Sequence, residues 1–111
     1  MRQILFVCTA NIARSPMARA LFNQLVVKMG LADQYGAQSA GTWGRDGFPA
    51  APEGVEVMAE RDIDIRSHRS RVVSGEIIAS ADLILTMEQG HKEALQIEFP
   101  QQKENIYMLT E

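Results

Sequence analysis

The sequence has a single cysteine, Cys8, among its 111 residues. A lone cysteine excludes a disulfide within the chain, and the opening MRQILFVC lacks the apolar run and the small-residue cleavage site of a signal peptide. We therefore expect a reducing compartment and a cytoplasmic protein. No segment approaches the roughly 18 apolar residues that span a membrane, so we expect no membrane association.

The chain also has little positive charge. Its formal net charge is -3, and no cluster of Lys and Arg dominates any stretch. The densest basic group, Arg66, Arg69 and Arg71, is largely offset by Asp62 and Asp64. This balance argues against a nucleic-acid partner. Apolar residues make up 46% and charged residues 23%, as in ordinary globular proteins, and the length suits one domain over residues 1–111.

An apolar run rich in β-formers at residues 3–7 predicts a buried strand. Ser15 suits the N-cap of a helix that follows, Pro16 suits its first turn, and Gly30 its carboxyl-terminal stop. The apolar positions of this helix recur every four residues, at Met17, Leu21, Leu25 and Met29. One strand therefore leads into one helix through a short polar loop.

Further along, strands alternate with helices. We expect strands ending at 38–40 and spanning 81–87 and 105–109, helices at 53–60, 74–80 and 88–98, and an exposed Gly- and Pro-rich loop at 41–52. This order predicts an α/β fold with a mostly parallel sheet and right-handed crossovers. Such sheets bind ligands beyond the carboxyl ends of their strands, which is where the segment from Cys8 to Arg14 lies.

The segment CTANIAR unites a thiol, a short loop and a cation. The thiolate is the nucleophilic form of cysteine, and a helix N-terminus and a neighbouring cation favour it. A loop closing onto a helix N-terminus can turn its N–H groups inward to hold a tetrahedral anion, and the planar fork of Arg14 can hold two of its oxygens. The residues between are small or neutral: Thr9, Ala10, Asn11, Ile12 and Ala13. This pattern indicates nucleophilic attack on phosphorus through a cysteinyl-phosphate.

A cysteine at the end of a strand is more often a small buried hydrophobic residue than a nucleophile. Standing alone, Cys8 would be interpreted in that way. The spacing of Cys8, five residues, Arg14 and Ser15 before a helix favours the functional interpretation.

These residues resemble the signature of the low-molecular-weight protein tyrosine phosphatases. VCTANIARSPMA matches it, and the resemblance continues through SAGTW (39–43), SHRSR (67–71) and ADLILTM (81–87), in order and over essentially the whole chain. It implies a four-stranded parallel sheet flanked by helices, in the three-layer arrangement of flavodoxin-like and Rossmann-like folds. It also implies hydrolysis of phosphotyrosine in proteins, without a metal ion or an organic cofactor.

The resemblance assigns roles to individual residues. Cys8 is the nucleophile, Arg14 clamps the phosphate, and the Ser15 hydroxyl stabilises the thiolate. Asn11 holds the loop through polar contacts with Ser15, Ser39 and His68, so that His68 is structural and not a general base. Ile12 and Trp43 wall the pocket and favour an aryl group. We expect His91, on a surface helix, to be merely solvated.

One element of the family is missing. The family protonates the leaving group with an Asp in an Asp-Pro segment, and these 111 residues contain no Asp-Pro. We therefore expect a fragment that lacks the acid loop and the last helix, with an unidentified general acid and weak activity. The uncovered apolar surface would favour self-association. Asp46 is the one nearby carboxylate worth testing as a substitute, although we expect it to be solvated.

Two substitutions distinguish the loop from the family pattern. Ala10 stands where the family usually has Gly, which would add strain if the position needs a positive φ. Ala13 replaces a second cysteine, so a loop disulfide cannot protect Cys8 from oxidation.

Three other functions remain to be weighed. A thioredoxin-coupled arsenate reductase needs further cysteines, and the chain has none. A protein arginine phosphatase on the same scaffold would want a polar contact at Ile12, so it ranks second. A non-catalytic phosphate or phosphoprotein binder would fit the missing acid but not the intact Cys8, Arg14 and Ser15. The expected partners are a phosphotyrosine protein or peptide, with a bacterial tyrosine kinase as one candidate, and phosphate, sulfate or vanadate as inhibitors.

Overall fold

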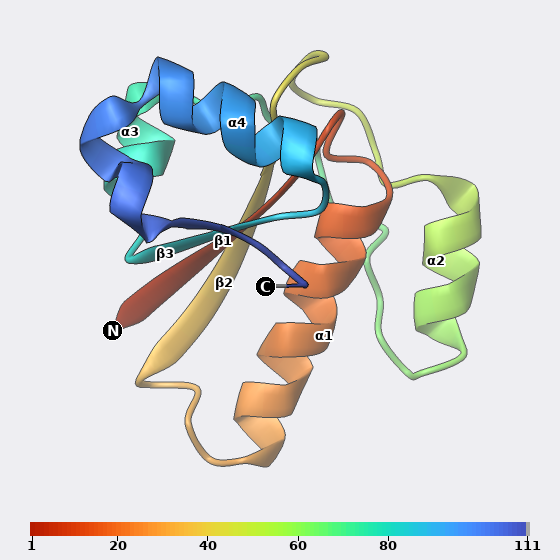
Figure 1. Ribbon diagram of the computed structural model, residues 1–111. Helices are drawn as coiled ribbons and strands as arrows, with labels where there is room; N and C mark the ends of the chain where they lie inside the picture. The colour runs from red at the N-terminus through yellow and green to blue at the C-terminus, as the bar shows by residue number, and fades with distance from the viewer. Residues whose placement is uncertain (111) are drawn as a thin grey trace.

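Four parallel strands form one sheet, in the order β2-β1-β3-β4, in a computed structural model that describes residues 1–110 (Figure 1). The strands are β1 (Arg2–Cys8), β2 (Tyr35–Gly41), β3 (Leu83–Thr86) and β4 (Ile106–Met108). Each corresponds to a strand expected from the sequence, and the parallel arrangement confirms the predicted α/β fold. The carboxyl ends of all four strands lie at one edge, as the binding-site argument requires.

Helices cover both faces of the sheet. They are α1 (Arg14–Lys28), α2 (Pro52–Ala59), α3 (Gly75–Ala79) and α4 (Gln89–Glu98), followed by a 3₁₀ helix (Pro100–Asn105) that the sequence did not predict. Figure 1 shows α3 and α4 together on one side, and α1 with α2 beyond it on the other. No helix among residues 1–110 combines the length and the apolar character needed to cross a membrane.

The alternation of side chains along β1 explains this layering. Leu5 and Val7 belong to the main core, which the sheet forms with Ile78 of α3 and Leu95 of α4. Phe6 points the other way and meets Phe22 of α1 edge-on, at 6.0 Å between ring centroids. A second, smaller core joins α1 to α2 and the segment that follows α2, with Ala50, Met58 and Ile65 at its centre.

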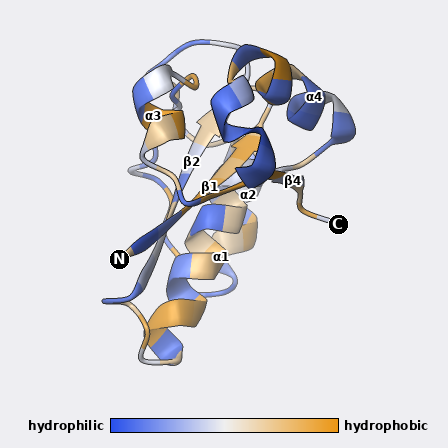
Figure 2. Ribbon diagram, turned by 60° about the vertical axis from the view of Figure 1, so that its left-hand side comes forward, coloured by the Kyte–Doolittle hydropathy of each residue, from blue (hydrophilic) through white to orange (hydrophobic). Residues whose placement is uncertain are grey.

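The predicted apolar stripe of α1 does not face the sheet. Met17 contributes to the second core, but Leu21, Leu25 and Met29 are exposed by 37%, 53% and 61%. The buried positions of the helix are instead Ser15, Pro16 and Val26. In Figure 2 the carboxyl-terminal turns of α1 are partly orange, which marks hydrophobic residues. Beyond Met17, the apolar stripe therefore lies on a face of α1 that residues 1–110 leave uncovered.

Side chains close the outer edge of β2. Asn23 accepts from the Ala37 N–H at 3.0 Å and donates to the Ala37 carbonyl at 3.3 Å, and Arg19 donates to the same carbonyl at 3.2 Å. Arg71 Nε donates to the Ser39 carbonyl at 2.9 Å. These contacts satisfy backbone groups that an edge strand would otherwise leave open.

Candidate active site

Cys8 ends β1, and a five-residue loop leads from it to α1. Its side chain is 4% exposed. The helix begins at Arg14 with Ala13 at the N-cap position and no side-chain capping bond, so the prediction of Ser15 as N-cap is wrong. The Ser15 hydroxyl lies instead 2.9 Å from Cys8 Sγ, because the helix starts early enough to turn that side chain inward to the thiol.

Asn11 organises the loop. Its φ of 60° places it in the left-handed region, which asparagine tolerates better than most residues. Its Nδ2 donates to Ser15 Oγ at 2.9 Å, and its Oδ1 accepts from the Arg71 N–H at 2.9 Å. Since Ser15 Oγ already accepts from Asn11, the hydroxyl proton is available to Cys8 Sγ. Ala10 does not adopt a positive φ, so its Cβ adds no backbone strain of the kind considered above. The described non-glycine residues with positive φ are Asn11 and Asp62.

His68 lies behind the loop and is buried. Its Nε2 is 2.7 Å from the Asn11 carbonyl oxygen, and because a carbonyl only accepts, Nε2 carries the proton of that bond. Burial lowers the pKa of His68, and the nearby cations Arg19, Arg69 and Arg71 lower it further, against the opposing effect of the Asn11 hydrogen bond. A neutral ring with Nε2 committed to the backbone suits a positioning role.

Ser39 lies close by and is buried, but the structure describes no hydrogen bond between it and Asn11 within residues 1–110. Arg71 connects the two, since its N–H reaches Asn11 Oδ1 and its Nε reaches the Ser39 carbonyl. Three of the four residues of the expected network are thus in direct contact, and the fourth joins through Arg71.

Two residues after β3 reach the loop from the opposite side. Glu88 pairs with Arg14 at 2.9 Å between Oε1 and Nη2, with both side chains about half exposed. His91 Nε2 lies 2.9 Å from Thr9 Oγ1. The prediction that His91 is solvated is wrong: it is 7% exposed, because the first turn of α4 folds it onto the loop, and burial lowers its pKa.

The segment that follows β2 also packs against the loop between Cys8 and Arg14. The Thr42 N–H donates to the Cys8 carbonyl and the Trp43 N–H to the Thr9 carbonyl, both at 2.9 Å. Trp43 is 78% exposed, so its indole stands at the surface beside the loop and not in the core. Ile12 is half-buried, and its carbonyl accepts from the Ala51 N–H at 2.7 Å.

Asp46 is not simply solvated, since its Oδ1 accepts from the Val72 N–H at 2.8 Å.

Glu88 and His91 are the site neighbours that sequence reasoning missed. Both follow β3, whose carboxyl end lies beside that of β1, and this adjacency was the signal available. Within residues 1–110 no three His, Cys, Asp or Glu side chains gather as a metal-binding group.

Comparison with known proteins places this geometry in a family. The model of the family described as "Low molecular weight phosphotyrosine protein phosphatase" matches residues 3–111. A probable low molecular weight protein-tyrosine-phosphatase, EpsP of Ralstonia nicotianae, is 39% identical over 99% of this chain and 72% of its own length. A protein-arginine-phosphatase of Bacillus subtilis is 36% identical over 97% of this chain and 70% of its own length.

Solved structures agree with this assignment. A YwlE mutant from Bacillus subtilis superposes with a TM-score of 0.93 at 34% identity, covering 99% of this chain and 72% of that one. A low molecular weight protein tyrosine phosphatase from T. tengcongensis superposes with a TM-score of 0.91 at 39% identity. This match covers 97% of this chain and 73% of that one. Together with the matching loop and sheet, these likenesses show that the chain belongs to the low molecular weight phosphotyrosine protein phosphatase family.

Proposed function

We propose that this chain hydrolyses phosphotyrosine in proteins through a cysteinyl-phosphate on Cys8. The observation that carries the proposal is the 2.9 Å contact between Cys8 Sγ and Ser15 Oγ, whose hydroxyl proton is freed by the Asn11 bond. A hydroxyl that donates to sulfur favours the thiolate, which is the attacking form. A related YwlE structure is described as a cysteine-to-serine mutant with a phosphorylated active-site serine, which supports phosphoryl transfer to this position.

The reaction proceeds in two displacements. In the first, the sulfur of Cys8 bonds to phosphorus while the bond from phosphorus to the tyrosine oxygen breaks, and the phenolate takes up a proton. In the second, water attacks phosphorus, the phosphorus–sulfur bond breaks, and inorganic phosphate leaves with the thiolate restored. The loop N–H groups and Arg14 stabilise the oxygens on phosphorus throughout.

Leaving-group protonation limits the first step. The 111 residues hold no Asp-Pro, and a general acid contributes about 10²–10⁴ in rate. We therefore expect slow turnover, with a preference for aryl phosphates whose leaving group needs no proton. Asp46 is engaged by the Val72 amide, which weakens its case as a substitute acid.

The test is to mix the protein with p-nitrophenyl phosphate, quench in acid, and measure phosphate bound to protein together with released nitrophenol. We expect a burst of nitrophenol, labelled protein and slow turnover, with no label on Cys8→Ala. Absence of both label and turnover would instead identify a non-catalytic phosphate binder. Vanadate and phosphate should compete with the substrate, and sulfate more weakly.

Arginine phosphatase activity is the second candidate, and one observation favours it. Relatives at 36% and 35% identity bear the name protein-arginine-phosphatase. Against it stands Ile12, which offers no polar side-chain contact to a guanidinium. Paired assays on one peptide carrying either phosphotyrosine or phosphoarginine should favour phosphotyrosine, and Ile12→Thr should shift the ratio toward phosphoarginine. A wild-type preference for phosphoarginine would reverse the ranking.

The proposed substrates are phosphoproteins that present a phosphotyrosine side chain at the surface, and a bacterial tyrosine kinase is one candidate. The indole of Trp43 is exposed beside the loop, where the aromatic ring of a substrate phosphotyrosine could pack against it. A reducing cytoplasm is the fitting location, because it keeps the sulfur of Cys8 available for attack.

A further inference from the structure

A cavity of about 610 Å³ lies along the outer edge of β2, between α1 and the segment 67–71. This volume falls within the usual range for small-molecule sites, about 300–1,000 Å³. Among residues 1–110, its lining includes the cations Arg19, Arg69 and Arg71 and no Asp or Glu, although the chain as a whole carries a net charge of -3. The cavity is thus a local concentration of positive charge on an acidic protein.

The three guanidinium groups contact carbonyl oxygens and not carboxylates. Arg19 donates from Nε to the Ala37 carbonyl, and Arg69 donates from Nη1 to the carbonyls of His68 and Arg66. None of the three forms an ion pair with a carboxylate in residues 1–110. The bonds fix where each group lies, yet most of the N–H donors of Arg19 have no acceptor among residues 1–110.

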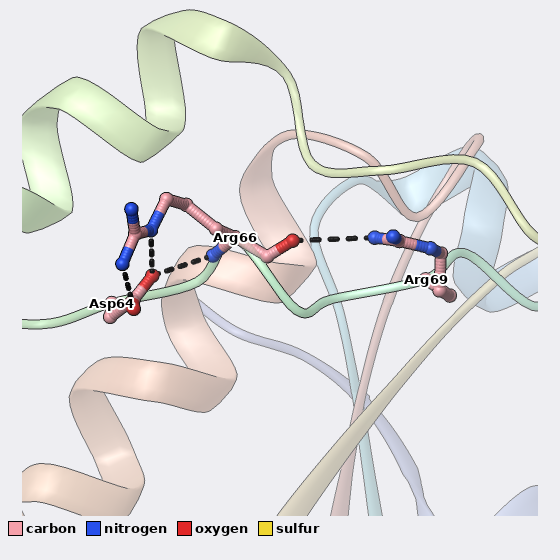
Figure 3. A network of polar contacts seen from close by, with 3 residues as sticks. All are labelled: Asp64, Arg66 and Arg69. Carbon is pink, nitrogen blue, oxygen red and sulfur yellow. Dashed lines mark hydrogen bonds and ion pairs between the residues drawn. The ribbon is translucent and has the colours of Figure 1, made fainter.

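The neighbouring Arg66 shows the contrast. Figure 3 shows the Arg66 guanidinium on both oxygens of Asp64, while the Arg69 guanidinium extends to the Arg66 carbonyl. Hydrogen bonds from Arg66 lower the pKa of Asp64 to about 2, so that pair is neutral as a unit. Arg66 is not part of the cavity lining, whereas Arg69 is.

Arg71 is the most enclosed of the three cations. It is half-buried, its Nη2 contacts Gln38 Oε1, and burial lowers its pKa, as does the charge of Arg19. The carboxylate of Asp46 acts in the opposite direction, but it is bonded to the Val72 amide. Arg19 and Arg69 are exposed, so solvent weakens the repulsion among the three cations, and a bound anion would remove what remains of it.

We propose that this cavity binds a small molecule carrying two or more phosphate groups. Guanidinium forks match phosphate oxygens in pairs, and three cations complement a polyvalent anion better than a single phosphate. The lining holds no Phe, Tyr or Trp on which a nucleobase would stack, so recognition rests on the phosphates. The site is separate from the Cys8 loop, although His68 and Arg71, which line it, also contact Asn11.

The test uses inorganic pyrophosphate as the probe and calorimetric titration at physiological salt. An Arg14→Gln background removes the cation of the catalytic loop and weakens anion binding there. Binding that remains is assigned to the cavity by whether it depends on Arg19 and Arg69, which lie outside that loop. We expect one pyrophosphate to bind this background protein. Adding Arg19→Gln or Arg69→Gln should weaken binding by at least about tenfold, as expected for loss of a charge-assisted hydrogen bond.

Arg66→Gln is the matched control, because it removes the same charge from the same segment outside the cavity. It should leave pyrophosphate affinity nearly unchanged. Absence of binding to the Arg14→Gln protein at millimolar pyrophosphate would overturn the proposal. Equal weakening by Arg66→Gln and Arg69→Gln would also overturn it, because the attraction would then come from general surface charge. Urea midpoints of all variants verify that each is folded.

Discussion

Replacement of Gly41 by alanine is the sharpest test of how the loop is held. A Cβ at this position would lie 2.6 Å from the Thr9 carbonyl oxygen, 3.0 Å from the Ala10 carbonyl carbon and 3.1 Å from the Asn11 nitrogen. All three are backbone atoms of the loop, so no side chain can swing aside. Ordinary carbon contacts lie at about 3.5–4.0 Å, and strand and loop would have to separate by about 1 Å.

A displacement of about 1 Å at reacting groups can reduce turnover about 100-fold, and overpacking typically costs about 1–3 kcal/mol of stability. We therefore expect Gly41→Ala to be folded, destabilised by that amount, and nearly inactive. The measurements are kcat/KM with p-nitrophenyl phosphate, vanadate affinity and urea unfolding.

Gly36→Ala is the control on the same strand. Its Cβ would meet the flexible side chains of Met1 and Gln3, at 3.2 Å and beyond, and these can move. Activity should stay close to that of the wild type. If Gly41→Ala matched Gly36→Ala in turnover and vanadate affinity, the idea that close backbone contact with β2 positions the loop would be refuted.

Three further outcomes follow from the same geometry. Glu88→Gln releases Arg14 from its ion pair and should tighten vanadate binding by up to about fivefold, since exposed pairs are worth about 0.2–1 kcal/mol. An unchanged inhibition constant for vanadate would show that the Glu88 carboxylate does not compete with vanadate for Arg14. Burial lowers the pKa values of His68 and His91 below their ordinary 6.5, so in acid the unfolded chain takes up protons that the folded chain does not. The free energy of unfolding in urea should therefore fall as the pH drops below about 6.5. The loss is at most about 1.4 kcal/mol per pH unit for each of the two histidines. A free energy of unfolding that stays constant down to pH 5 would contradict this expectation. Leu25→Lys should reduce the concentration-dependent self-association expected from the exposed face of α1, and a wild type that sediments as a monomer at all concentrations would remove that expectation.

Much of the fold follows from local patterns. β1 and β3 are short apolar runs bounded by polar segments, and such runs identify buried strands because both faces of a parallel sheet are covered. The 3₁₀ helix was missed because its six residues, PQQKEN, contain no apolar position, and periodicity is the signal that sequence reasoning relies on.

The orientation of α1 could not be derived in this way. Its four-residue repeat predicts a helix correctly, but periodicity does not say which face a sheet will cover. Phe22 and Val26 lie on the buried side because Phe6 projects there from β1, and that is a property of the packed fold.

In the candidate site, contacts between residues close in the sequence were predictable, and contacts between distant segments were not. The contact of Cys8 with Ser15 joins residues 7 apart, within one continuous segment whose loop and helix were predictable. The contact of Thr9 with His91 spans 82 residues. This contact depends on the pairing of β3 with β1, which sequence patterns do not reveal. His91 was therefore expected to be an ordinary surface residue.

The side-chain bonds along the outer edge of β2 have a consequence for the proposed phosphoprotein substrates. With the Ala37 amide and carbonyl and the Ser39 carbonyl already bonded to side chains, an incoming extended peptide cannot pair with these three groups of β2. At this edge we therefore expect a peptide to make contact mainly through its phosphorylated side chain, at the carboxyl ends of the strands. An enzyme of this shape should tolerate wide variation in the residues that flank its target.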